Sequence, residues 1–129
     1  MIIPIDPNRT LGYSQAVRVG DLLFVSGQVS VNEKGETVGL GDIKAQAEQV
    51  FKNLRTVVEA GGSELGLVAK MTVLATSLDY LLAIREARLR VFGPIGRYPA
   101  STFMVVAGLA KPEYLVEIEA VAMIKGAPA

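Results

Sequence analysis

The stretch RYPASTFMVVAGLAKPEYLVEIEAV, residues 97–121, decides the fold. An apolar run from Phe103 to Ala110 and a second run that starts at Tyr114 flank the turn-forming segment Lys111-Pro112-Glu113. Runs of this kind on either side of a proline-containing turn are typical of strands. We therefore expect two long strands joined by a short connection, with the rest of the chain packed around them.

Alternation with a period of two residues gives the second of these strands two different faces. One face carries two apolar and two acidic side chains: Leu115, Glu117, Glu119 and Val121. The other face is apolar: Tyr114, Val116, Ile118 and Ala120. Two carboxylates therefore share one face with apolar neighbours, which makes them the best candidates for catalytic groups.

The composition is that of a folded globular protein. Of the 129 residues, 50% are hydrophobic and 20% are charged, and the 13 basic side chains balance the 13 acidic ones. A net charge of zero gives no reason to expect nucleic acid or an anionic membrane as a partner. We expect one domain spanning residues 1–129, and because a small domain cannot hide so much apolar surface alone, we expect it to self-associate.

The chain contains neither Cys nor His. Disulfides, thiolate catalysis, the usual general base near pH 7 and the commonest zinc ligand are thereby excluded, and we expect no metal site. Catalysis would have to use carboxylates, hydroxyls, Lys, Arg, backbone donors and water. Met1-Ile2-Ile3-Pro4 does not resemble a signal peptide, and no apolar run is long enough to span a bilayer, so we expect a cytoplasmic protein.

The first third of the chain predicts a hairpin after an irregular start. Residues 1–12 are expected to be irregular, and strands at 14–19 and 22–25 would be joined by a tight turn at Gly20-Asp21. The next segment, Ser26-Gly27-Gln28, is either a simple strand end or a bulge at which the backbone approaches a ligand.

The middle of the chain predicts a helix followed by a central strand. Apolar residues recur at helical spacing over residues 42–60, with Asp42 as an N-cap and Gly61-Gly62 as the end. Residues 68–77 are β-branched and apolar, as in a central strand. Together with a second helix at 79–92, these elements predict a two-layer α+β fold with both helices on one face of a mixed sheet.

The second predicted helix has an apolar stripe that includes a charge. The stripe consists of Leu78, Leu81, Leu82, Leu89 and Phe92. A step of about 100° per residue places Arg85 within it. A charge there is costly unless it is paired or reaches water, so Arg85 would either extend along its packed stem to solvent or point into a cleft and bind an anion.

Six segments of the chain resemble the RidA/YjgF family. They are GYSQA (12–16), LFVSGQ (23–28), QAEQVFKNL (46–54), EAGGS (59–63), YPA (98–100) and VEIEAVA (116–122). The resemblance implies a chorismate-mutase-like fold and a homotrimer, in which three sheets form a central barrel and small-metabolite clefts lie between subunits. It also implies hydrolysis of reactive enamines and imines to keto acids and ammonia, without a cofactor.

The resemblance also implies a set of site residues. Glu117 would position the attacking water as the catalytic carboxylate, assisted by Tyr13, and the backbone at Ser26 and Gly27 would complete the pocket. In the best-known members an Arg follows the Pro-Ala pair and forks onto the substrate carboxylate. This chain has Ser101 there, followed by Thr102, so a charged contact worth about 2–5 kcal/mol is missing.

Several groups could compensate for the missing Arg. Arg85 stands where the family often has Asn, so it would either take over the anchor or pair with Glu117 or Glu119, and Arg97 is a third candidate. Two functions stay open at this point. One is an imine or enamine hydrolase with an altered substrate, anchored by Arg85 or Ser101, and the other is a non-catalytic trimer that binds a small metabolite. Zero net charge and the lack of His argue against a ribonuclease.

Overall fold

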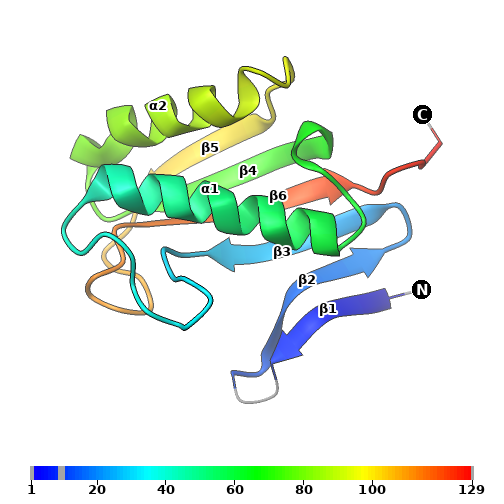
Figure 1. Cartoon of the computed structure of the whole chain (residues 1–129), viewed down its shortest axis with the longest axis horizontal. Coiled ribbons are helices and arrows are strands. Elements are labelled where there is room, and N and C mark those ends of the chain that lie inside the picture. The colour runs from blue at the N-terminus through cyan, green and yellow to red at the C-terminus, as the bar shows by residue number, and fades with distance from the viewer. Residues whose placement is uncertain (1, 9–10, 129) are drawn as a thin grey trace.

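The computed structural model describes residues 2–8 and 11–128, and it shows one sheet with two helices on one of its faces (Figure 1). The strands follow the order β1-β2-β3-β6-β4-β5. The strands and α-helices are β1 (Ile2–Asn8), β2 (Tyr13–Val19), β3 (Leu22–Gln28), α1 (Ile43–Ala60), β4 (Val68–Ala75), α2 (Leu81–Phe92), β5 (Ala100–Val105) and β6 (Val116–Met123), and two short 3₁₀ helices precede β4 and α2. Among the strands of the described residues, β4 and β5 are the one pair that runs parallel. The predicted two-layer α+β architecture is confirmed.

The expectation of an irregular N-terminus is wrong for residues 2–8. They form the edge strand β1, which pairs antiparallel with β2 from Ile2 opposite Val19 to Asn8 opposite Tyr13. Residues 1, 9 and 10 lie outside the described residues. The two prolines of this segment misled the prediction, because an edge strand tolerates proline where its outer N–H groups have no partner.

The two strands of the opening stretch are present, but they are not neighbours. β4 lies between β5 and β6, and the connection runs over residues 106–115 rather than through a short turn. The backbone N–H of Val106 donates to the Ala75 carbonyl at 2.9 Å, and that of Thr76 donates to the Leu115 carbonyl at 3.1 Å. The apolar run after Val105 therefore belongs to a crossover past the end of β4.

Alternation along β6 is confirmed. Val116, Ile118 and Ala120 are buried beneath the helices, whereas Glu117 is half-buried and Glu119 is exposed on the opposite face. The acidic face of β6 is thus the face that the helices leave open.

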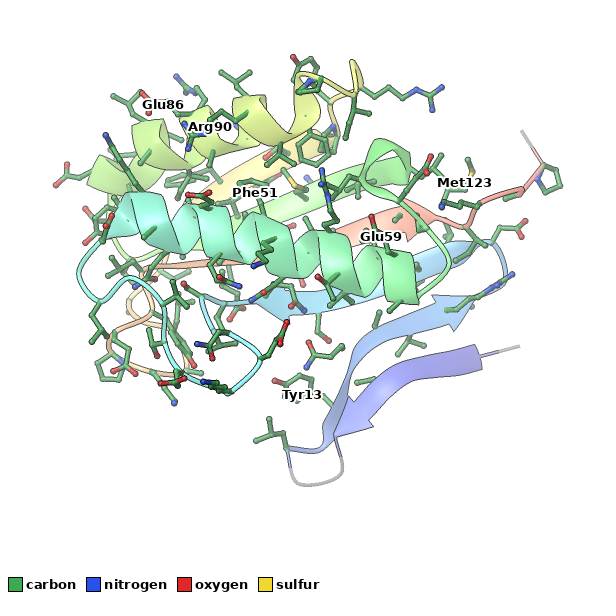
Figure 2. The ribbon with its side chains drawn as sticks, in the orientation of Figure 1. Tyr13, Phe51, Glu59, Glu86, Arg90 and Met123 are labelled. Atoms are coloured by element: carbon green, nitrogen blue, oxygen red, sulfur yellow. The ribbon has the colours of Figure 1, made fainter. Side chains whose placement is uncertain are left out.

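Helix α1 begins and ends where its sequence predicts. The Asp42 side chain accepts a hydrogen bond from the backbone N–H of Ala45 at 3.1 Å, and the helix ends before Gly61-Gly62. Its apolar face covers the sheet, and Phe51 packs edge-to-face on Phe92 of α2 with ring centroids 6.2 Å apart. Figure 2 shows Phe51 where the two helices meet.

Replacing Asp42 with Ala is expected to lower the free energy of unfolding by about 1 kcal/mol, because an N–H of the first turn loses its acceptor. Asn at the same position keeps an acceptor oxygen and should retain most of the stability. Urea denaturation of the three proteins measures the effect. Equal midpoints for the Ala variant and the parent would show that the cap contributes nothing.

A buried glutamine connects α1 to the strand that carries the acidic residues. The Gln46 amide nitrogen donates to the carbonyls of Gly39 at 3.0 Å and Glu113 at 2.9 Å, and its oxygen accepts from the Leu115 N–H at 2.9 Å. These bonds satisfy backbone groups that would otherwise be buried without partners. They fix the entry of the chain into β6 just before Glu117.

The apolar stripe predicted for α2 is buried only in part: Phe92 is buried, but Leu78, Leu82 and Leu89 are not. The helix buries Ile84, Ala87 and Phe92. Leu78, Leu82 and Leu89 are exposed, Leu82 by 65%, and Arg85 on the same side is exposed with them. The helix has two apolar sides, and helical periodicity alone could not decide which of them meets the sheet.

The face of the sheet opposite the helices is uncovered in the single chain. It presents apolar side chains that are exposed at its surface, among them Leu22, Phe24 and Met104. The second apolar side of α2 is exposed as well. These two surfaces agree with the expectation that the chain self-associates. In the described part of the chain, neither helix has the length and apolar character that crossing a bilayer requires.

Candidate functional site

The segment after the hairpin is a bulge and not a simple strand end. The pairing register between β3 and β6 shifts between Val25 and Gln28, and β3 continues through Ser26 and Gly27 to Gln28. The Ser26 hydroxyl donates to the Ser14 carbonyl at 2.6 Å, and the buried Gln28 amide donates to the Ser26 carbonyl at 3.1 Å. One hydrogen bond to β2 and one within β3 therefore stabilise the bulge.

The Glu117 carboxyl group lies directly against Gly27. A Cβ added at Gly27 would lie 2.6 Å from the Glu117 Cδ, so no larger residue fits without moving the carboxyl group. Burial raises the pKa of Glu117 above its usual value, and the nearby Glu119 carboxylate raises it further. A carboxyl group of this kind holds a proton more readily than an exposed one, which suits a group that must take up and return a proton.

Tyr13 is the first residue of β2 and precedes Ser14, whose carbonyl accepts the hydrogen bond from Ser26. Its side chain is 48% exposed, and Figure 2 shows it on the part of β2 that lies away from the helices. The bond from Ser26 to the carbonyl of Ser14 connects the two strands next to it. Ser26, Gly27 and Glu117 therefore form one group, which we call the bulge cluster, and a place for Tyr13 beside it stays a prediction.

The same open face carries a second polar group toward β5. A shallow depression of about 220 Å³ is lined by Phe24, Lys70, Thr72 and Glu119 with their neighbours. The Lys70 ammonium donates to the Thr102 hydroxyl at 2.6 Å. Thr102 is thus on the acidic face of the sheet, on an edge strand.

Ser101 points to the other side of the sheet, as expected from the alternation of side chains along β5. It is in register with the buried Met71 of β4, and its hydroxyl accepts a hydrogen bond from Arg88 Nη1 of α2 at 3.1 Å. Burial lowers the pKa of Arg88, and the neighbouring Arg85 lowers it further. We call Arg85, Arg88 and Ser101 the arginine cluster.

Among residues 2–8 and 11–128 of one chain, no acidic side chain forms an ion pair with either arginine of this cluster. Lys125 and Glu64, 3.4 Å apart, form the single salt bridge within residues 2–8 and 11–128. Within one chain, Arg85 therefore forms no ion pair with Glu117 or Glu119, and pairing between subunits stays a prediction.

The predicted site residues thus fall into two groups that one chain does not bring together. The bulge cluster and Thr102 belong to the open-face side of the sheet, and Ser101 with Arg85 lies on the side of α2. β4 separates β5 from β6. A site that uses both groups at once needs a second chain. Arg97, the third candidate anchor, is exposed.

Two charged residues near these groups escaped the sequence analysis. Arg88 is three residues from Arg85 and so shares its side of the helix, a spacing that was available in the sequence. Lys70 alternates with the buried Met71 on β4, and that alternation likewise predicts its open face. Neither signal says which strand lies next to β4, and that pairing is what brings Lys70 to Thr102.

The described residues show no metal centre of the usual composition. No three acidic, His or Cys side chains in residues 2–8 and 11–128 are grouped so that they could hold an ion. The bulge cluster offers a carboxyl group, a hydroxyl and backbone groups.

The sequence matches known proteins over most of its length. The family model described as Endoribonuclease L-PSP matches residues 5–124. A RutC family protein of Sinorhizobium fredii, y4sK, is 40% identical over 125 residues, which cover 94% of this chain and 97% of the relative. A 2-iminobutanoate/2-iminopropanoate deaminase of Escherichia coli is 34% identical over 112 residues, with 86% of each chain covered.

Solved structures show the same fold. The YjgF gene product of Escherichia coli matches with a TM-score of 0.82 at 34% identity, covering 91% of both chains. TdcF of Escherichia coli with bound serine matches with a TM-score of 0.80 at 34% identity, covering 86% of this chain and 87% of that one. The fold is therefore the chorismate-mutase-like fold that the sequence resemblance implied. On the family match and these relatives together, the chain belongs to the Endoribonuclease L-PSP family, also called RidA/YjgF.

Proposed function

We propose that this chain, as one RidA/YjgF-like domain of residues 1–129, hydrolyses small imines or enamines to keto compounds and ammonia. The observation that carries the proposal is the Glu117 carboxyl group held against the Gly27 bulge with a raised pKa. Relatives from Escherichia coli and Dermatophagoides farinae, 34% and 33% identical, bear the name 2-iminobutanoate/2-iminopropanoate deaminase. Their name supports the reaction class for this chain.

The proposed mechanism uses Glu117 as general base and then as general acid. The ionised carboxylate takes a proton from water while the water oxygen bonds to the imine carbon and the C=N π electrons move to nitrogen. The protonated carboxyl group then returns its proton to that nitrogen, which gives a carbinolamine. Glu117, ionised again, takes the proton of the carbinol O–H group and passes it to the amino nitrogen as the C–N bond breaks and the carbonyl forms. The products are the keto compound and ammonia. Tyr13 and the polar groups at Ser26 and Gly27 would hold the substrate, and Thr102 would line the pocket.

We further propose that the site is completed between subunits of a homotrimer. The bulge cluster and the arginine cluster lie on opposite sides of the sheet within one chain, and both the open sheet face and one side of α2 expose apolar side chains. A second copy would cover these surfaces and bring the two clusters of different chains together. Gel filtration with light scattering should give the mass of three chains, and a monomer would remove the basis for the shared site.

A coupled assay tests the hydrolase directly. An amino-acid oxidase generates 2-imino acids in the presence of semicarbazide, and the protein competes with this trap for the imine. We expect less semicarbazone and more keto acid as the protein concentration rises. Semicarbazone yields that do not change with any imino acid, from a protein shown to be a folded trimer, would contradict the proposal.

The second candidate is a non-catalytic trimer that binds a small metabolite in the same cleft. Ser101 in place of the usual Arg favours it, because the strand then carries no charged anchor. A screen of keto acids and amino acids by thermal shift measures such binding, since a ligand that binds the folded state raises Tm. Stabilisation without any imine hydrolysis would favour this candidate over the enzyme.

A further inference from the structure

The arginine cluster has the composition of an anion site. It includes Ser101, the position of β5 at which the best-known family members have an Arg. We propose that Arg88 of α2, oriented by Ser101 and supported by Arg85, binds the carboxylate of the substrate. The charged anchor would then be on the helix and not on the strand. This inference rests on the proposed function, because it assigns the substrate class as 2-imino acids.

The charges on α2 support the proposal first. Arg85 and Arg88 are one helical turn apart on the same side of α2, and like charges at this spacing destabilise a helix. No acidic side chain within the described ranges is ion-paired with either of them. Arg88 is also partly buried, which makes its unpaired charge more costly. An anionic ligand would offset both costs.

The hydrogen bond to Ser101 supports it second. Arg88 Nη1 donates to the Ser101 hydroxyl at 3.1 Å, which holds the guanidinium next to β5. A guanidinium has five N–H donors, so donors remain to form a two-pronged contact with a carboxylate. The Ser101 hydroxyl accepts from Arg88 and keeps its own proton to donate. Ser101 therefore orients the charge and adds one neutral donor to the site.

The position of Arg88 on α2 supports it third. Ile84 and Ala87 are buried against the sheet, and Leu82 and Leu89 are exposed on another side of the helix. Arg88 lies between these two sides and reaches β5 at Ser101. Its guanidinium is thus at the border of the surface that we propose a second copy covers. An anion bound there would lie beside the subunit that supplies Glu117.

Calorimetric titration with 2-oxobutanoate, a stable 2-keto acid, tests the anchor without turnover. Replacing Arg88 with Ala should raise Kd at least about tenfold, because a charge-assisted hydrogen bond is lost. Lys at this position keeps the charge but cannot form two parallel hydrogen bonds to a carboxylate, so it should restore only part of the affinity. The matched control is Arg90→Ala. Arg90 is on the same helix (Figure 2) but lines the groove between α1 and α2. The affinity of the Arg90→Ala protein for 2-oxobutanoate should therefore equal that of the parent.

A charge-relocation variant separates a lost anchor from a damaged fold. Adding Ser101→Arg to the Arg88→Ala protein places a guanidinium on the strand and should recover affinity to within a few fold of the parent. The neutral analogue 2-oxobutanamide should bind the parent at least about tenfold more weakly than the acid, because it cannot form the charged contact. Its affinity should be the same for the parent and the Arg88→Ala protein.

Three outcomes would overturn the proposal. The parent and the Arg88→Ala protein could bind 2-oxobutanoate with equal affinity, or the parent could bind the acid and the amide with equal affinity. The third outcome is that the parent does not bind the acid at millimolar concentration. The hydrolase proposal fails separately. Binding that depends on Arg88 without imine hydrolysis would leave the anchor and remove the hydrolase. Imine hydrolysis with unchanged kcat/KM in the Arg88→Ala protein would leave the hydrolase and remove the anchor.

Discussion

Replacing Glu117 with Gln is expected to lower kcat for imine hydrolysis by about 10²–10³-fold while the protein stays folded, because the amide cannot accept the proton of the attacking water. The raised pKa comes from burial first and from Glu119 second, so the isosteric Gln removes a charge that the fold disfavours. The coupled imine assay measures the loss, and circular dichroism checks the fold. Undiminished turnover would remove Glu117 from the mechanism.

The pH dependence follows from the same carboxyl group. The base must be ionised, so activity should fall as pH drops through a pKa above the ordinary value of 4.5. Because the folded pKa is raised, the stability that Glu117 contributes is present below its unfolded pKa and is lost as pH rises through the folded pKa. At pH 7 the Gln variant should therefore be at least as stable as the parent. A Tm well below the parent's would contradict this assignment of the charge.

Replacing Gly27 with Ala is expected to lower kcat/KM by about 10²-fold, because its methyl group would occupy space held by the Glu117 carboxyl group. The methyl carbon would lie 2.6 Å from Cδ, so the carboxyl group must move away from its catalytic orientation. The carboxyl group is the end of a flexible, half-buried side chain and can move aside, so the free energy of unfolding should change by no more than about 1 kcal/mol. Steady-state kinetics and urea denaturation measure the two effects.

Gly108→Ala is the matched control for this substitution. Gly108 is in the crossover between β5 and β6, and a Cβ there meets no atom within 4 Å. Both activity and stability should stay close to those of the parent. A Gly27→Ala protein that behaves like this control would show that Glu117 does not need its position on the bulge.

Much of the fold could be predicted from local patterns. The alternation along residues 116–123, the cap at Asp42 and the turn at Gly20 are local signals, and the structure confirms each. The neighbours of β5 and β6 were not predictable in the same way. An apolar run followed by Lys111-Pro112-Glu113 indicates a turn, but it does not reveal that β4 inserts between the two strands.

The candidate site shows the same limit. Alternation and resemblance together identified Glu117 and Gly27, and the structure places them in contact. Helical spacing placed Arg85 on an apolar stripe, but α2 has two such sides, and tertiary packing buried the one with Ile84. The contact of Arg88 with Ser101 joins residues 13 apart through the packing of α2 on β5, and no pattern in the sequence specifies that packing.

Complementation between two impaired variants, assayed at a substrate concentration well below KM, tests the account's central claim, a site shared between chains, most directly. Glu117→Gln and Arg88→Ala chains are mixed in equal amounts, unfolded and refolded together, and assayed for imine hydrolysis. In randomly mixed trimers, about a quarter of the sites should combine an intact Glu117 from one chain with an intact Arg88 from the next. The account predicts activity near that fraction of the parent's, well above either variant refolded alone. Activity of the mixture no higher than the average of the two variants would show that the two clusters do not form one site between chains.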